Sequence, residues 1–235
     1  GLGHGPDLVA DGGLHPSMLR FRRVLVCASS IRGDVPFEPE ATVGHEAGPR
    51  APKGTDRMST ILVTGASGFV GSYAVPALLA ADHRVVALVR TPEAGRLVLD
   101  RLPEADRARV ELRTGDVTRP GTLPDSLVGV DGVLHLVAIP RDRRGGEELR
   151  LVNTEGTRAV VTAMRTAGVK RLVHMGAMGV SDDPALHYAS SKAKAEALVA
   201  ASDLDWTILK PSLQFGPGDG FFNIIAGLIR MSPGI

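Results

Sequence analysis

Two residues in the second half of the chain, Tyr188 and Lys192, have the types and the spacing that proton transfer needs. They are four positions apart, so if residues 187–202 form a helix, both side chains emerge on one face. A neighbouring ammonium favours the phenolate and lowers the pKa of a tyrosine from about 10. Tyr188 is therefore predicted to donate or accept a proton in a reaction at this site.

Three glycines, Gly65, Gly68 and Gly71, follow an apolar run at 60–64 and open a segment with helical spacing. Gly65 permits a tight turn, Gly68 leaves the backbone open to a pyrophosphate, and Gly71 lets the helix pack close to the strand. The start of a helix also offers N–H groups and a partial positive charge to phosphates. The turn predicts a dinucleotide site; the alternative is a glycine-rich turn without a ligand.

Five segments of the chain form a wider pattern. They are TGASGFVG at 64–71, GDV at 115–117, VNTEGT at 152–157, YASSK at 188–192 and LKPSLQFGPGD at 209–219. In order and separation they resemble the extended and atypical short-chain dehydrogenase/reductase superfamily, which includes NAD-dependent epimerases and dehydratases. The resemblance covers Met58 to the C-terminus. From Tyr188 to Phe222 the chain looks most like NAD(P)-binding proteins related to the nucleotide-binding accessory subunit of respiratory complex I.

The resemblance implies hydride transfer to or from a nicotinamide, and it implies which residues surround the cofactor. Lys192 is expected to bond the nicotinamide ribose as well as to assist Tyr188. Asp116 is equally well explained as a turn residue or a helix cap before Thr118. The expected cofactor-binding set is Gly65, Ser67, Gly68, Phe69, Val70, Gly71, Arg90, Asp116, Val117, Leu136, Val137, Ala138, Lys192 and Pro211, with Ser212 beside it.

Arg90 ends the second predicted strand, at the position where an acidic residue would bond the ribose 2′-hydroxyl of NAD. A guanidinium can instead form a bidentate pair with a 2′-phosphate. NADP(H) is therefore the predicted cofactor, with NAD as the alternative. Arg90 can also be interpreted as an ordinary surface arginine at a strand end.

One catalytic group of the superfamily pattern is missing. The Ser or Thr that donates a hydrogen bond to the substrate oxygen has no counterpart in residues 175–179, which read MGAMG, and the next hydroxyl is Ser181. Loss of such a donor costs on the order of 10²–10³ in rate if no other group substitutes. Asn153 matches an asparagine of the pattern, but it could equally cap the following helix.

The elements that must position these residues alternate along the chain. Strands are predicted at 60–64, 84–90, 109–113, 132–138, 170–175 and 205–210, and helices at 69–82, 93–101, 121–128, 147–168 and 187–202. Alternation with strands that are apolar on both faces indicates a parallel sheet covered by helices on both sides. The predicted fold class is α/β, a doubly wound Rossmann sheet with strand order 3-2-1-4-5-6.

The regions outside this pattern have a different composition. Residues 1–57 are rich in Gly and Pro, show no sustained period, and are expected to be a disordered or non-native extension before a domain at 58–235. After the sixth strand, the apolar run FFNIIAGLI begins what would be a truncated substrate region. The net charge of +1 supplies no reason to expect nucleic acid, and no apolar stretch is long enough to span a membrane.

Side chains that often signal other chemistry are sparse. Cys27 is the single cysteine, so a reducing, cytoplasmic location is expected. His135, His174 and His187 lack metal-ligand spacing and are predicted to be core or loop residues, with no metal site.

Three hypotheses follow from these observations. The first is an NAD(P)-dependent oxidoreductase or epimerase that uses Tyr188 and Lys192 on a small-molecule substrate. The second is a binding protein that holds the dinucleotide without turnover and acts through a protein partner. The third is an incomplete, inactive gene product.

Overall fold

The computed structural model describes residues 44–47, as backbone, and residues 58–220, in which seven strands form one sheet. The sheet order is β1-β7-β6-β5-β2-β3-β4. Six strands are parallel: β2 (Thr60–Thr64), β3 (Arg84–Val89), β4 (Val110–Thr114), β5 (Gly132–His135), β6 (Arg171–Met175) and β7 (Asp205–Lys210). Numbered among themselves, these six have the order 3-2-1-4-5-6. The predicted doubly wound Rossmann sheet is confirmed.

The seventh strand, β1 (Gly44–Ala47), pairs antiparallel with β7 and places Gly44 opposite Lys210. The sequence shows no strand period in residues 1–57, so β1 is an addition to the six predicted strands. Pairing at an open sheet edge requires only an extended main chain, which side-chain periodicity does not report. The rest of residues 1–57, and the apolar run in 221–235, lie outside the described residues.

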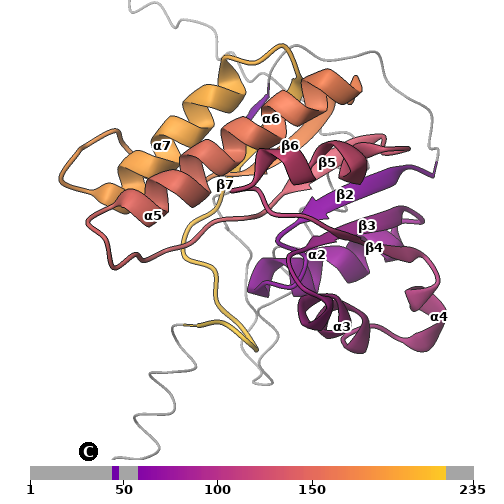
Figure 1. Cartoon of the computed structure of the whole chain (residues 1–235). Helices are drawn as coiled ribbons and strands as arrows, with labels where there is room; N and C mark the ends of the chain where they lie inside the picture. Colours follow the sequence, from indigo (N-terminus) through magenta and orange to yellow (C-terminus); the bar gives the residue numbers. More distant parts are fainter. Residues whose placement is uncertain (1–43, 48–57, 221–235) are drawn as a thin grey trace, which may run out of the picture.

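Helices cover both faces of the sheet (Figure 1). Leu62 and Val133 pack in the core under α6 (Gly156–Ala167) and α7 (His187–Ala200). Their chain neighbours Val63 and Leu134 pack on the opposite face, with α2 (Phe69–Ala80) and α3 (Pro92–Asp100). Because side chains of a strand alternate between faces and both faces are buried, the strands appear in the sequence as continuous apolar runs.

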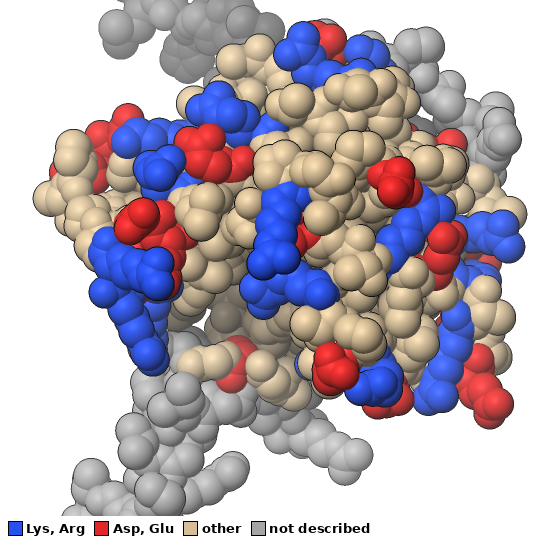
Figure 2. Space-filling model, in the orientation of Figure 1, with Lys and Arg blue, Asp and Glu red and all other residues tan. Residues whose placement is uncertain are grey.

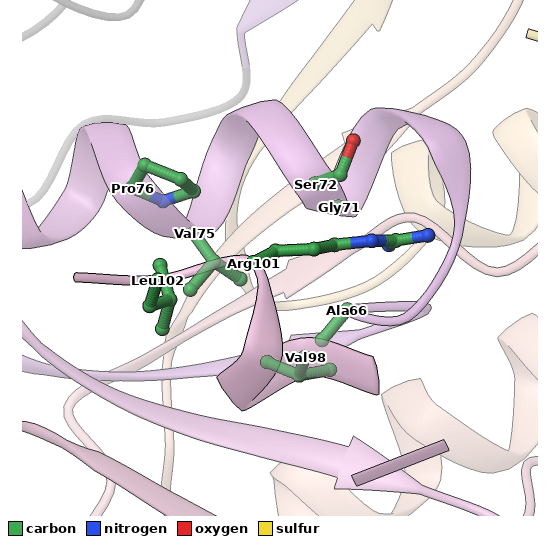
Figure 3. Close-up of a pocket in the computed structure, with 8 residues that line it drawn as sticks. All are labelled: Ala66, Gly71, Ser72, Val75, Pro76, Val98, Arg101 and Leu102. Carbon is green, nitrogen blue, oxygen red and sulfur yellow. The ribbon is translucent and has the colours of Figure 1, made fainter. Parts of the chain in front are cut away.

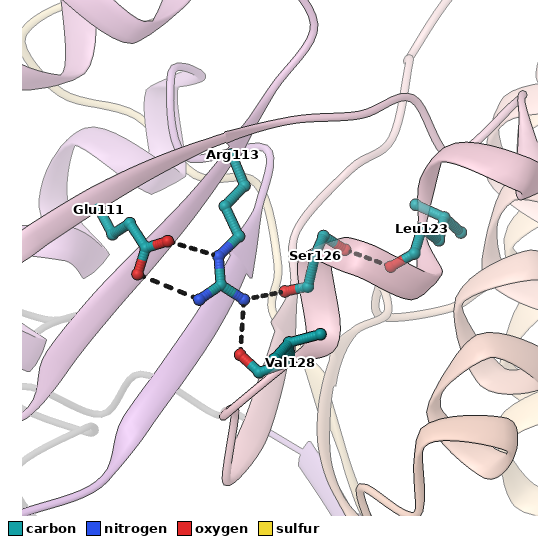
Figure 4. A network of polar contacts seen from close by, with 5 residues as sticks. All are labelled: Glu111, Arg113, Leu123, Ser126 and Val128. Carbon is teal, nitrogen blue, oxygen red and sulfur yellow. Dashed lines mark hydrogen bonds and ion pairs between the residues drawn. The ribbon is translucent and has the colours of Figure 1, made fainter.

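The predicted helix at 121–128 is absent. The segment instead forms two 3₁₀ turns, η2 (Pro120–Thr122) and η3 (Pro124–Leu127), each starting at a proline that has no N–H to continue a helix. Figure 4 shows how the segment is held: Nη1 of Arg113 in β4 donates to the carbonyl oxygens of Ser126 (3.0 Å) and Val128 (2.7 Å). Bonds from a neighbouring strand replace those that a helix would have made.

The predicted helix at 147–168 is helical throughout but not uniform. It consists of α5 (Glu147–Leu149), a π-helical segment η4 (Arg150–Glu155) and α6. A further short helix, α4 (Glu104–Arg107), was not predicted. Wider π turns are common at functional sites because they redirect side chains, and η4 carries Asn153.

Within the described ranges, no helix combines the length and apolar character required to cross a membrane. On the face drawn in Figure 2, basic and acidic side chains are interspersed. Among the described residues, Arg158 of α6 pairs with Glu155 of η4 at 2.9 Å.

Candidate functional site

The glycine turn links the end of β2 to the start of α2. Gly65 has a positive φ of 74°, and a Cβ there would lie 3.1 Å from the backbone nitrogen of Val137. The turn is closed by a hydrogen bond of 3.0 Å from the N–H of Gly68 to the carbonyl oxygen of Gly65. The positive φ and the close approach of Val137 favour a residue without a side chain at 65, as the sequence predicts.

Gly71 sets the distance between α2 and the turn. A Cβ built on Gly71 would lie 2.5 Å from the carbonyl oxygen of Gly65 and collide with that of Ala66. The cap residue Gly68 contributes no side-chain hydrogen bond, and the first turn of α2 contains no acidic residue. The N-terminal N–H groups of α2 can therefore receive an anion, and the turn fits a dinucleotide pyrophosphate.

The residues predicted to flank the turn lie on neighbouring strand ends. β3 pairs with β2 so that Leu88 lies opposite Thr64, and the exposed Arg90 follows β3 directly. The strand predicted at 132–138 ends at His135, and Leu136 turns toward the glycines, its N–H bonded to the carbonyl oxygen of Thr64 at 3.2 Å. Val137 is half-buried and Ala138 is exposed. These residues thus gather at the carboxyl edge of the sheet.

Asp116 and Val117 follow β4 and have structural contacts of their own. Oδ1 of Asp116 accepts hydrogen bonds from the N–H and the hydroxyl of Thr118, at 2.9 and 2.8 Å. This is the turn geometry that the sequence left open for Asp116. Val117 is buried and packs against Gly156, where an added Cβ would approach it to 2.8 Å.

Asn153 does not cap a helix. Its Oδ1 accepts a hydrogen bond from the N–H of Ile139 (2.8 Å), and its Nδ2 donates to the carbonyl oxygen of Ile139 (3.1 Å) and to the hydroxyl of Ser191 in α7 (3.0 Å). The π turn directs this amide across the fold. Asn153 thus ties the segment after β5 to the helix that carries Tyr188 and Lys192.

Tyr188 and Lys192 both lie on α7, but their environments differ. Tyr188 is 37% exposed, whereas Lys192 is 2% exposed and its Nζ donates to the carbonyl oxygen of Met175 at 2.5 Å. Burial lowers the pKa of Lys192 to about 8, and the Glu196 carboxylate opposes part of that shift. Partial burial, together with Glu196, raises the pKa of Tyr188. The predicted lowering of this pKa is wrong in direction, because loss of hydration and the Glu196 carboxylate both disfavour the phenolate.

Glu196 was missed by the sequence analysis and lies against the segment that lacks the hydroxyl. Its Oε1 accepts a hydrogen bond from the N–H of Ala177 at 3.0 Å, and its Oε2 lies 3.3 Å from Nζ of Lys210. A Cβ on Gly176 would collide with this carboxylate and lie 3.0 Å from Ile208. The segment after β6 therefore has no room for a side chain at position 176.

The segments after β6 and β7 are bound together. The N–H of Met178 donates to the carbonyl oxygen of Pro211 at 2.9 Å, which places the half-buried Pro211 and the exposed Ser212 next to the loop that follows β6. Further along, the hydroxyl of Tyr73 in α2 donates to the carbonyl oxygen of Pro217 at 2.8 Å. The chain after β7 therefore crosses to the helix of the glycine turn.

Two of the predicted core histidines form a buried stacked pair. His135 and His174 lie opposite each other on β5 and β6, with ring centroids 5.3 Å apart. Nδ1 of His135 is 2.7 Å from the Thr64 hydroxyl and Nε2 is 3.0 Å from that of Thr157. Burial lowers the pKa of His135 to about 3 and also lowers that of His174. The pair stays neutral at physiological pH; within the described residues, no group of three metal-ligating side chains occurs.

We expect the difference in free energy of unfolding between Lys192→Met and the wild type to depend on pH. The folded pKa of about 8 lies below the ordinary value of 10.5, so between these values the unfolded chain binds more protons and wild-type stability rises with pH. Relative to Lys192→Met, the wild type should gain up to ~3 kcal/mol across this window. Urea denaturation at several pH values measures the difference, with the exposed Lys194→Met as control. A difference that stays constant with pH would contradict the prediction.

Comparisons with known proteins agree with this geometry. Residues 65–219 match a family model described as NAD(P)H-binding. The sterol demethylase protein B of Methylococcus capsulatus is 35% identical over 180 residues, which cover 68% of this chain and 53% of that protein. The ceramide reductase of Caulobacter vibrioides is 31% identical over 176 residues, 73% of this chain and 53% of the relative. The chain thus spans about half the length of these relatives.

A solved structure supports the same assignment. The Bordetella bronchiseptica enzyme WbmG in complex with NAD has a TM-score of 0.54 and 25% identity, and the match covers 64% of this chain and 52% of WbmG. The glycine turn, the strand order and the family match all indicate a nicotinamide dinucleotide as the ligand. This chain belongs to the NAD(P)H-binding family, within the superfamily of short-chain dehydrogenase/reductase-like and epimerase/dehydratase proteins.

Proposed function

We propose that this chain is an NADP(H)-dependent reductase of carbonyl groups in which Tyr188 is the proton donor. The position of Lys192 is the observation that supports this proposal. It is buried at the carboxyl end of β6, one helical turn from the partly exposed Tyr188, on the same sheet edge as the glycine turn. A buried ammonium beside a solvent-facing phenol suits proton transfer next to a dinucleotide.

The residues have complementary roles in such a reduction. The nicotinamide, when bound, supplies the hydride. The raised pKa of Tyr188 keeps its hydroxyl protonated at neutral pH, so this group can donate a proton to the carbonyl oxygen as that oxygen gains charge. Lys192 would stabilise the resulting phenolate, and solvent can return the proton because Tyr188 is partly exposed.

A second candidate function is a non-catalytic NADP(H)-binding accessory or sensor protein. The crowding of Gly176 by Glu196 favours it, because a hydroxyl-bearing side chain at this position would require the Glu196 carboxylate to move. In this case the dinucleotide would stabilise one form of the protein for a protein partner. The sequence of residues 188–222, which resembles that of complex I accessory proteins, also favours this non-catalytic function.

We further infer that the substrate is large and apolar. Large apolar side chains are exposed on the segments after β6 and β7 and around the start of α7, the elements that surround Tyr188. They are Met178, Leu186, Leu213 and Phe215, each 45% exposed or more. Exposed apolar patches next to a site favour an apolar ligand. Two relatives are named for a sterol and a ceramide, which have this character.

Replacing Arg90 by Ala should weaken NADPH binding roughly 10- to 100-fold, because a charge-assisted pair with the 2′-phosphate is lost. NADH, which has no such phosphate, should bind nearly as before. Titration calorimetry of purified protein with each nucleotide measures both affinities. Arg84→Ala, at the other end of β3, is the matched control for loss of one exposed charge.

Different results would contradict different parts of the proposal. If the wild type binds NADH far more tightly than NADPH, the assignment of Arg90 to a 2′-phosphate is wrong. If it binds neither nucleotide, the proposed function itself is wrong.

A further inference from the structure

Arg101 reaches from the end of α3 to the glycine turn, a contact that was not predicted from the sequence. Its Nη1 donates to the carbonyl oxygen of Ser67 at 2.9 Å and lies 3.5 Å from that of Gly68. Figure 3 shows the extended side chain passing under the first turn of α2, beside Gly71 and Ser72. A cation thus lies on the carbonyl side of the turn.

The stem of Arg101 borders apolar side chains. Arg101 lines a small pocket with Val75 of α2, Val98 of α3 and Leu102, each of which is buried, whereas Arg101 itself is exposed. Methylene groups of an arginine can cover apolar surface while the guanidinium makes polar bonds.

These bonds orient two peptide groups of the turn. The carbonyl of Ser67 shares a planar peptide with the N–H of Gly68, and the carbonyl of Gly68 shares one with the N–H of Phe69. Because the two groups of a trans peptide point in opposite directions, Arg101 turns both N–H groups to the other side. One of them closes the turn on Gly65, and the N–H of Phe69 begins α2, where an anion would bind.

We propose that Arg101 is a positioning residue that holds the glycine turn in its nucleotide-binding form before the dinucleotide arrives. This inference rests on the dinucleotide binding proposed above. It assigns Arg101 a role different from that of Arg90. Arg101 acts on the turn that receives the pyrophosphate, which NADH and NADPH share, whereas Arg90 selects between them.

The test compares Arg101→Ala and Arg101→Lys with Arg96→Ala, which removes an exposed charge from the same helix where it pairs only with Glu93 among the described residues. Arg101→Ala should weaken NADH and NADPH by the same factor, roughly tenfold. The affinities of Arg101→Lys for both nucleotides should lie between those of Arg101→Ala and the wild type, because lysine retains a hydrogen-bond donor but lacks the planar guanidinium. Arg96→Ala should bind both nucleotides as the wild type does.

A second measurement uses no nucleotide. Hydrogen exchange of the backbone amides of residues 66–72 in the unliganded protein should be faster in Arg101→Ala than in the wild type and unchanged in Arg96→Ala. Unchanged exchange together with unchanged affinities would overturn the inference. So would loss of NADPH binding alone, since that would make Arg101 a direct 2′-phosphate contact.

The failure of this inference can be told apart from failure of the proposed function. If the wild type binds neither nucleotide, the proposed function fails, and with it the binding role of Arg101. If the wild type binds and Arg101→Ala binds equally well with the same exchange, only the positioning role fails.

Discussion

Tyr188→Phe is expected to reduce the rate of carbonyl reduction by about 10²- to 10⁴-fold, the range that a positioned acid or base contributes. The substitution removes the hydroxyl that would donate the proton and retains the aromatic ring. The glycine turn and Lys192 are unaffected, so the affinity for NADPH should be nearly unchanged. The combination of lost turnover and retained binding is what distinguishes a proton donor from a residue that supports the fold.

Turnover is measured by NADPH oxidation with a panel of steroid ketones, long-chain ketones and small ketones. The proposed apolar substrate predicts that the first two groups react faster than the third. Ser202→Ala is the matched control, because it removes a hydroxyl at the far end of the same helix, where it bonds the carbonyl oxygen of Val199 at 2.6 Å. A Tyr188→Phe variant that retains its rate would exclude Tyr188 as the donor.

The same panel distinguishes the two candidate functions. If the wild type binds NADPH and turns over none of the ketones, the reductase proposal is contradicted and the accessory or sensor function is supported. The absence of Ser and Thr from residues 175–179, where Glu196 crowds Gly176, would then be the structural reason.

Gly71→Val is expected to weaken nucleotide binding and to lower the stability of the fold. The Cβ would lie 2.5 Å from the carbonyl oxygen of Gly65, so either α2 or the turn must move. Overpacking of this kind costs about 1–3 kcal/mol of stability. Displacement of the turn by ~1 Å should weaken binding on the order of 100-fold, by analogy with misplaced catalytic groups.

Calorimetric titration with NADPH and thermal unfolding measure the two effects. Gly121→Val in η2 is the matched control, because a Cβ at Gly121 meets nothing within 4 Å and its φ is not positive. The control separates the free-energy cost of replacing a glycine by valine from the cost of the collision between the new Cβ and the Gly65 carbonyl oxygen. Normal NADPH affinity in Gly71→Val would contradict the assignment of this turn to the pyrophosphate.

Local features explain most of what could be predicted. A strand of a parallel sheet is apolar along its whole length, and a helix has a period near 3.6, so both are visible in short windows of sequence. The spacing of Gly65, Gly68 and Gly71 is also local, and its steric requirement depends on residues near the turn. The strand order follows because right-handed crossovers leave few alternatives.

Predictions that depended on distant residues were less reliable. The helix at 121–128 was lost to prolines and to bonds from Arg113, and the π turn at Asn153 has no periodicity of its own. Arg101 and Glu196 looked like ordinary charged residues of helices. Their partners, Ser67 and Ala177, are 34 and 19 positions away in the chain.

The sequence by itself determined the class of protein: a parallel α/β sheet whose first strand leads into a phosphate-binding turn, with a tyrosine and a lysine on one later helix. Side-chain period acts between near neighbours in the chain, and so do the collisions of Gly71 with Gly65 and Ala66, although Gly65 is also confined by Val137 of a distant segment. Only the tertiary structure decided the electrostatics of the site. The pKa of Tyr188 is raised rather than lowered, and Lys192 is buried against Met175, because hydration and charge depend on which distant segments fold over each group.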